Sequence, residues 1–183
     1  MSEATYYLRY FGDPILRKKT TPVAQVTPDI RALAEGMYAV MYGARGIGLA
    51  APQVGDPRRV FIVDVEPEEG ARVKRVFVNP VLVAKEGSMI GEEGCLSIPG
   101  LYADVKRAAK VVLEALDEDG APFRIEAEGL LARALQHELD HLDGVLFIDR
   151  LSIIRRKLLE PKLEKIRQEA QSPAGLSSPP SSL

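Results

Sequence analysis

The sequence predicts one compact domain that combines α-helices with β-strands. Some stretches repeat apolar residues every three or four positions, as helices do, and others are short runs rich in valine, isoleucine and phenylalanine, as strands are. The chain has 183 residues, 46% of them hydrophobic, which is enough for one core. Since no repeat or linker divides it, we expect a single domain over residues 1–171 and a disordered Ser/Pro-rich tail over residues 172–183.

Three helices are predicted. The first is expected over Pro28–Gly43, with Thr27 as its N-cap, because apolar residues recur there at helical spacing. The second covers about Glu128–Leu142 and stops at a following Asp-Gly pair. The third covers about Ser152–Gln171 and is basic and amphipathic, and Pro161 is expected to kink or divide it.

Strands are predicted where valine-rich runs lie between turn residues, and two of these runs flank an Asp-Gly dipeptide that is typical of a hairpin. A polar, glycine-containing segment predicts a loop. In chain order, the expected segments are strands at Arg59–Val65, Val73–Asn79 and Val81–Lys85, a loop over Gly91–Gly100, and a hairpin of Val111–Leu116 and Phe123–Ala127.

The charge and the N-terminus argue against several partners. The net charge is −2, so we expect neither DNA nor a membrane as a partner. The first five residues lack the basic region and apolar run of a signal peptide, and no apolar run approaches the ~20 residues that span a bilayer. A single cysteine, Cys95, excludes an internal disulfide and, without an export signal, favours the reducing cytoplasm.

The strongest signal of chemistry lies in the second predicted helix, where His137 and His141 are four residues apart. Histidines at this spacing project from one face, so both imidazoles can reach one metal ion. Glu138, next to the first histidine, is placed to hold a water molecule beside the metal and to move its proton.

The pattern around the histidines predicts that they face inward. One narrow stripe of the helix contains Leu130, Ala134, His137 and His141, and leucines fill the adjacent arc. Burying two imidazoles and a carboxylate is unfavourable unless they are paired or bound to metal, so a metal site is favoured over a chance match on a solvated helix. Four polar residues are expected on the opposite side: Arg133, Gln136, Asp140 and Asp143.

A catalytic site of this kind needs a third protein ligand and an open position for water. The candidates are Cys95 and two downstream carboxylates, Asp149 and Glu160. A thiolate binds zinc or ferrous iron strongly, although a lone cysteine is more often a small buried apolar residue. The polar, glycine-containing segment around Cys95 suits a loop that presents a side chain, which favours the cysteine.

A glycine-rich segment, Gly46–Gln53, precedes the first predicted strand. It lacks the third glycine of a dinucleotide-binding fingerprint. Gly46 and Gly48 would let the backbone pass close to a ligand, and Gln53 would offer an amide donor nearby. A plain connection between two elements explains the same segment equally well.

Taken together, three segments resemble the peptide deformylase family. Gly46–Gln53 matches its Gly-x-Gly-Leu-Ala-Ala-Pro-Gln loop, Glu93–Ser97 its Glu-Gly-Cys-Leu-Ser segment, and Gln136–Gly144 its Gln-His-Glu-x-Asp-His-Leu-x-Gly helix. The order and approximate separations agree, and the similarity extends from about Tyr6 to Leu151. The resemblance implies an α+β fold with antiparallel β-sheets packed around a central metal-binding helix.

The resemblance also implies the reaction. The enzyme would be a metal-dependent hydrolase that removes the N-formyl group from the formyl-methionine of newly made polypeptides and releases formate. Cys95, His137 and His141 correspond to the ligands of one divalent ion, commonly Fe²⁺ in the family, with Zn²⁺, Ni²⁺ or Co²⁺ also possible. Glu138 corresponds to the general base and acid.

Further positions correspond to groups that stabilise or line the bound substrate in the family. Gln53 and the backbone N–H of Leu96 match its oxyanion donors. The residues expected to line the substrate cleft are Ile47, Gly48, Glu93 and Leu130. Two positions depart from the pattern: Tyr102 stands where some members carry a peptide-binding arginine, and Arg133 stands where some relatives are apolar near the methionine pocket.

Two other functions fit parts of the sequence. A metalloprotease would take its third ligand from Asp149 or Glu160. A ribosome-associated binding module would need a closed structural metal site, but no second cysteine or third histidine is available to close it. The basic last helix would contact the ribosome, which the resemblance also allows for an enzyme, although interleaved glutamates favour a solvated face. Its basic residues are Arg155, Arg156, Lys157, Lys162, Lys165 and Arg167, and its glutamates are Glu160, Glu164 and Glu169.

Overall fold

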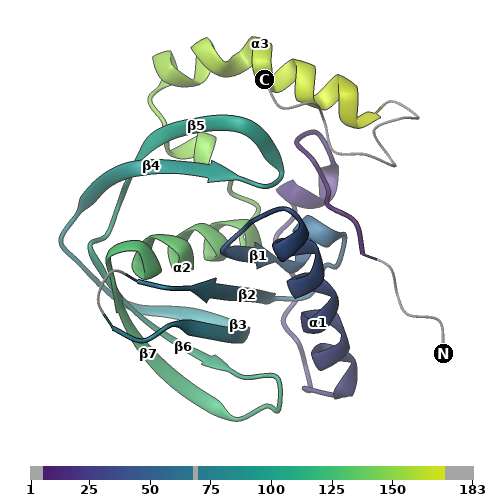
Figure 1. The fold of residues 1–183 in the computed structure, drawn as a ribbon, viewed down its shortest axis with the longest axis vertical. Helices are drawn as coiled ribbons and strands as arrows, with labels where there is room; N and C mark the ends of the chain where they lie inside the picture. Colours follow the sequence, from purple (N-terminus) through teal and green to yellow (C-terminus); the bar gives the residue numbers. More distant parts are fainter. Residues whose placement is uncertain (1–5, 68–69, 172–183) are drawn as a thin grey trace.

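The computed structural model describes residues 6–67 and 70–171, and the Ser/Pro-rich tail expected over residues 172–183 lies outside the described residues. The fold is α+β, with antiparallel sheets and helices (Figure 1). The helices are α1 (Pro28–Gly43), α2 (Gly129–Leu142) and α3 (Ile153–Gln171). The strands are β1 (Gly48–Ala50), β2 (Val60–Val65), β3 (Val73–Glu86), β4 (Met89–Cys95), β5 (Ile98–Arg107), β6 (Lys110–Leu116) and β7 (Pro122–Glu128).

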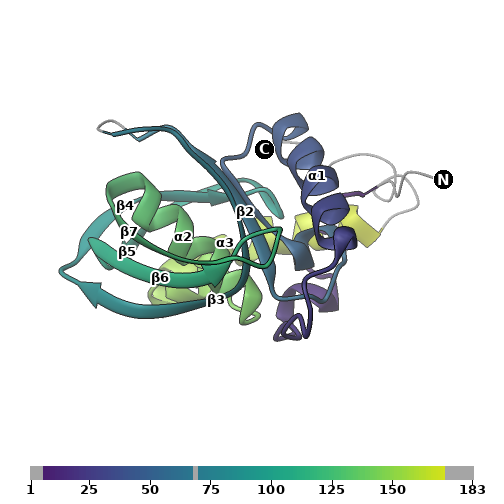
Figure 2. The same ribbon diagram turned by 90° about the horizontal axis from the view of Figure 1, so that it is seen from below.

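Helix α2 lies between the two sheets. The larger sheet has the order β1-β2-β3-β6-β7, and the smaller one is the β4–β5 hairpin; every pairing is antiparallel. One side of α2 packs on β1 and β2, while the hairpin crosses its other side and α3 lies beyond β5 (Figures 1 and 2). This arrangement leaves one long face of α2 directed toward the hairpin.

The core fixes α2 against the larger sheet. Phe61 and Phe77 stack with their ring centroids 4.5 Å apart, and Leu135 and Leu142 of α2 belong to the same fully buried cluster. Each such side chain contributes roughly 1.5–3 kcal/mol by leaving water. A second buried cluster joins α1 to the opposite face of the sheet, through residues such as Met37. The helix that carries the histidines therefore rests on a closely packed sheet.

The three predicted helices are confirmed to within one residue. One detail needs correction: helix α3 runs continuously through Pro161, so the proline does not divide it. Thr27 is the N-cap residue of α1, as predicted, but its hydroxyl donates to the side chain of Asp29 and bonds no backbone N–H.

The strand predictions need two corrections. Val73–Asn79 and Val81–Lys85 form one strand, β3, with a bulge between them. The bulge follows from Asn79, which adopts a φ of +52° while its side-chain amide bonds both the N–H and the carbonyl of Val23 at 2.8 Å. The segment expected to be a loop over Gly91–Gly100 is instead a hairpin: most of it belongs to β4 and β5, with a tight turn after Cys95.

None of the described helices combines the length and the apolar character that crossing a membrane requires.

Candidate metal centre

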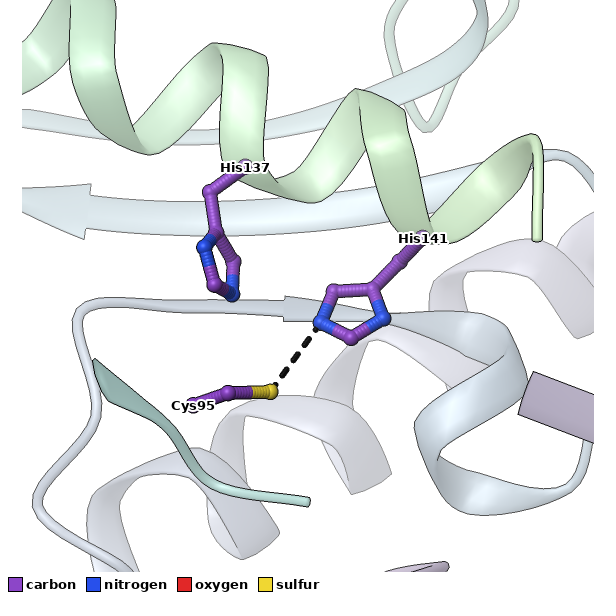
Figure 3. Close-up of side chains that lie close together, drawn as sticks. All are labelled: Cys95, His137 and His141. Carbon is purple, nitrogen blue, oxygen red and sulfur yellow. Dashed lines mark hydrogen bonds between the residues drawn. The ribbon is translucent and has the colours of Figure 1, made fainter. Parts of the chain in front are cut away.

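Three side chains of the kinds that bind metals converge between α2 and the β4–β5 hairpin. His137 and His141 project from the same face of α2 toward Cys95, the last residue of β4 (Figure 3). Their possible ligand atoms all lie within 4.8 Å of one another, and the Cys95 Sγ lies 3.2 Å from the His141 Nε2. The spacing of four residues places the two imidazoles one turn apart, as expected.

The two downstream carboxylates do not join this group. Asp149 forms ion pairs with Arg17 and Arg156. Glu160 is exposed on α3. Among the alternatives that the sequence left open, the structure therefore brings only Cys95 to the histidines.

Glu93 fixes the orientation of the His137 ring. The Nδ1 atom of His137 lies 3.0 Å from Glu93 Oε2, so it donates its proton there and leaves Nε2 directed at the site. Burial alone would lower the pKa of His137, but contacts with Cys95 and Glu93 outweigh it and raise the pKa well above its usual value. The surroundings thus favour positive charge at this imidazole.

A buried ion-pair network holds Glu93 in turn. Arg107 donates to the Glu93 carboxylate from Nε at 2.8 Å and from Nη2 at 2.9 Å. Arg133 donates to the same carboxylate from Nη1 at 2.8 Å. Burial would raise the pKa of Glu93, but its bonds from Arg107 and His137 prevail and lower it. Arg107 also donates from Nη1 to the Asp140 carboxylate at 2.5 Å. The expectation that Arg133 lies on the side of α2 opposite the histidines is wrong, because it is only 9% exposed and pairs with Glu93, the same carboxylate that bonds His137.

The other imidazole lacks such a partner. His141 is 1% exposed, and its Nδ1 has no hydrogen-bond partner among the described residues. Burial and the neighbouring His137 lower its pKa well below the usual value, so the ring is neutral. A neutral imidazole is the form that binds a metal.

Glu138 also has an unpaired buried atom. Its Oε2 has no partner among the described residues, and burial raises its pKa to about 7. A Cβ at Gly48 would lie 2.4 Å from Glu138 Oε1, so glycine at this position of β1 leaves the space that the carboxylate occupies. One thiol, two imidazoles and an unpaired carboxylate fit a divalent ion accompanied by water.

Gln53 lies on the other side of the cysteine. Its Oε1 accepts from the Ala50 N–H at 2.9 Å, which fixes the amide so that Nε2 lies 3.1 Å from Ser97 Oγ and 3.6 Å from Cys95 Sγ. Gln53 is 1% exposed but reaches the cleft. The sequence predicted a nearby amide donor, and the structure brings this one beside the cysteine.

A cavity of about 1010 Å³ opens onto these groups. The residues expected to line the cleft do line this cavity: Ile47, Gly48, Glu93 and Leu130. It is also lined by Gln53, Cys95, Leu96, His137 and Glu138. Tyr102 also lines it. Sequence reasoning missed Tyr6, Tyr7 and Tyr10, which form another part of the wall, because they belong to an irregular N-terminal segment that carries no pattern.

Comparison with known proteins identifies the family. The family model described as polypeptide deformylase matches residues 6–157. The chain belongs to the polypeptide deformylase family. The peptide deformylase of Alkalilimnicola ehrlichii is 52% identical over 165 residues, which cover 90% of this chain and 92% of that protein.

Solved peptide deformylases share the fold. The Thermus thermophilus enzyme is 43% identical with a TM-score of 0.83, and the match covers 91% of this chain and 99% of that one. The enzyme from Synechococcus elongatus, solved in complex with actinonin, is 39% identical with a TM-score of 0.79 and covers 88% of each chain. This chain is thus a deformylase that removes the N-formyl group from nascent peptides, and it carries a Cys/His/His group suited to the metal on which the family depends.

Proposed function

We propose that Cys95, His137 and His141 hold one catalytic divalent ion and that Glu138 moves the protons of the reaction. The observation that supports this most is the convergence of one sulfur and two ring nitrogens within 4.8 Å, beside a buried carboxylate oxygen that has no partner among the described residues. An ion bound there would acidify a water molecule and polarise the formyl oxygen.

Glu138 would act twice. Its carboxylate first takes a proton from the attacking water, which adds to the formyl carbon. The C–N bond then breaks, and Glu138 delivers the proton to the departing nitrogen, leaving formate and a free amine. A carboxyl group whose pKa is raised by burial to about 7 is suited to both steps near neutral pH.

Gln53 and the N–H of Leu96 would stabilise the negative charge on the formyl oxygen. The Gln53 Nε2 lies near Cys95 Sγ, and Leu96 follows the cysteine directly. Losing one such donor typically costs about 10²–10³-fold in rate. We expect Gln53→Leu to lower kcat by this amount.

Ile47, Gly48, Glu93 and Leu130 would line the substrate site. β1 is an edge strand of the larger sheet, so its free edge can pair with an extended peptide. The first side chain of the substrate would then enter the cavity beside Leu130 and Ala134, which are close to His137 on α2. Actinonin, which the Synechococcus enzyme binds, would occupy the same cavity here.

Fe²⁺ is the proposed native ion. One thiolate and two imidazoles suit ferrous iron and zinc, and Ni²⁺ or Co²⁺ would fit the same ligands. Elemental analysis after anaerobic purification tests the identity. Activity that survives prolonged exposure to air would argue against iron.

The decisive experiment measures formate release from a formyl-Met tripeptide by metal-loaded protein. Glu138→Gln should lower turnover by about 10²–10⁴-fold while the metal content stays at the wild-type level, because the carboxylate moves protons without binding the ion. Glu128→Gln, at an exposed position before α2, is the matched control and should keep full activity. Wild-type turnover by Glu138→Gln would refute the role of this residue.

We also propose a cytoplasmic location, because the substrate is a nascent chain. A ribosome contact through α3 is a further proposal. Ile153, Ile154 and Leu158 are at least 73% exposed, and Arg155 and Arg156 lie among them. Cosedimentation with ribosomes should weaken in Arg155→Glu. Equal cosedimentation of that variant would count against the contact.

A further inference from the structure

Arg133 is a buried cation in the wall of the cleft. It lies one helical turn before His137, is 9% exposed, and lines the cavity together with Leu130 and Ala134. Burying a guanidinium is costly unless hydrogen bonds offset the loss of water. The hydrogen-bond partners of Arg133, and its donors that have none, therefore influence which ligands the cavity can bind.

Among the described residues, only one nitrogen of this guanidinium has a hydrogen-bond acceptor. Nη1 donates to Oε1 of Glu93 at 2.8 Å and to the carbonyl of Val105 at 3.0 Å. Nε and Nη2 donate to none of the described residues, and neither belongs to the fully enclosed unpaired atoms. Both nitrogens therefore keep some contact with solvent, and the side chain that carries them lines the cavity.

The backbone of β4 sets the position of the guanidinium. A Cβ built on Gly91 would lie 2.9 Å from Nη2 and 3.2 Å from Cζ of Arg133. Glycine at this position thus makes the room that the arginine occupies. With Glu93 holding Nη1 and β4 closing one side, the group is fixed before any ligand arrives.

The charges around Arg133 leave it incompletely neutralised. The connected ion pairs contain three arginines, Arg107, Arg133 and Arg150, but only two carboxylates, Glu93 and Asp140. Glu93 also accepts a hydrogen bond from His137. The wall at Arg133 therefore favours a ligand that brings a hydrogen-bond acceptor.

We propose that Arg133 gives the pocket for the substrate's first side chain a polar end, so that the enzyme also deformylates peptides that begin with formyl-methionine sulfoxide. This inference rests on the proposed function, which puts that side chain beside Leu130. A thioether is a weak acceptor, whereas a sulfoxide oxygen is a strong one, and oxidation of methionine produces it readily. The sulfoxide is not reduced; water still cleaves the formyl C–N bond, giving formate and an amine.

The test compares kcat/KM for two tripeptides that differ only in the sulfoxide oxygen. Arg133→Met removes the donors and keeps an unbranched side chain, so the ratio of sulfoxide to methionine turnover should fall by about tenfold, as expected for losing one charge-assisted hydrogen bond. Arg124→Met, on the exposed face of β7, is the matched control and should leave the ratio unchanged. An unchanged ratio in Arg133→Met overturns the inference. If the wild type deformylates neither tripeptide, the proposed function fails instead.

A second variant and a binding measurement cover the case in which Arg133→Met does not fold. Gly91→Ala keeps the arginine but displaces its guanidinium, because the added Cβ would lie 2.9 Å from Nη2. The ratio of sulfoxide to methionine turnover should therefore change, and an unchanged ratio contradicts the inference. In the metal-loaded Glu138→Gln protein, calorimetry measures binding without turnover, and adding Arg133→Gln should weaken the sulfoxide peptide selectively; equal weakening of both peptides also contradicts it.

Discussion

The two histidines of the site lie four residues apart on one helix, yet their surroundings differ. His137 gives its Nδ1 proton to Glu93, whose carboxylate is fixed by Arg107 and Arg133. His141 is more deeply buried, and its Nδ1 has no partner among the described residues. One imidazole is thus held at Nδ1 by a charged network, and the other has no such support at Nδ1 among the described residues.

The difference extends to protonation. The pKa of His137 is raised, since its contacts with Cys95 and Glu93 outweigh burial, whereas burial lowers the pKa of His141. The β4–β5 hairpin supplies both Cys95 and Glu93, so it favours a cation at the end of the site where His137 lies. A bound metal ion would take the place of the proton that His137 otherwise attracts.

The largest effect is expected when either histidine is removed. His137→Ala and His141→Ala should both reduce metal content and formate release to background, because two remaining ligands hold an ion weakly. Elemental analysis and the formate assay check this. Asp143→Asn, at the exposed end of α2, is the control and should keep its metal. A His141→Ala protein that keeps its metal would mean that Cys95 and His137 hold the ion without His141.

A smaller but selective effect is expected at Glu93. Glu93→Gln should weaken metal binding about 10–100-fold, because an amide cannot orient His137 and satisfy two arginines at once. Competition with a chelator measures the affinity. Glu92→Gln, the exposed neighbour on β4, should bind metal like the wild type. Equal affinity of the two variants would show that packing alone orients His137.

The pH dependence separates Glu138 from both imidazoles. Burial raises the pKa of Glu138 to about 7, and the reaction begins with its carboxylate form, so kcat/KM should fall as pH drops through this pKa. The charge of a bound ion should move the falling limb to lower pH than 7. Glu138→Gln should remove the limb from its residual activity. A limb that persists in this variant belongs to another group.

The smallest effect is expected one contact farther away. Asp140 accepts from Arg107 at 2.5 Å and from Arg150 at 3.1 Å, but it touches no proposed metal ligand through these bonds. Asp140→Asn should weaken metal binding by less than about tenfold, below the loss in Glu93→Gln. A chelator titration of both variants checks the order. A larger loss of metal affinity in Asp140→Asn than in Glu93→Gln would show that Glu93 is not the main support of the His137 ring.

The helix and its histidines could be predicted because their signals are local. The apolar period of α2 and the spacing of His137 and His141 lie within one segment, and the β6–β7 hairpin was indicated by its turn residues. Glu138 followed from its place beside His137. The residues alone favoured Cys95 as the third ligand but left Asp149 and Glu160 open, and the resemblance to a known family singled out the cysteine.

The support of His137 could not be predicted in the same way. Glu93 bonds Arg107, Arg133 and His137, which are 14, 40 and 44 residues away in the sequence. The periodicity of apolar residues carries no information about such distant pairings. β4 was assigned to a loop because glycines and glutamates lack the alternation of a half-buried strand. Arg133 was expected on the side of α2 opposite the histidines because it is charged, whereas a buried carboxylate partner, Glu93, holds it on the cleft side.

X-ray absorption at the metal edge of the loaded protein tests the three-ligand centre most directly. The account predicts one sulfur at about 2.3 Å, two imidazole nitrogens at about 2.0–2.1 Å and a further light atom from solvent. The sulfur signal should vanish in Cys95→Ser. A wild-type spectrum without sulfur, or one with a fourth ligand from the protein chain, would contradict it.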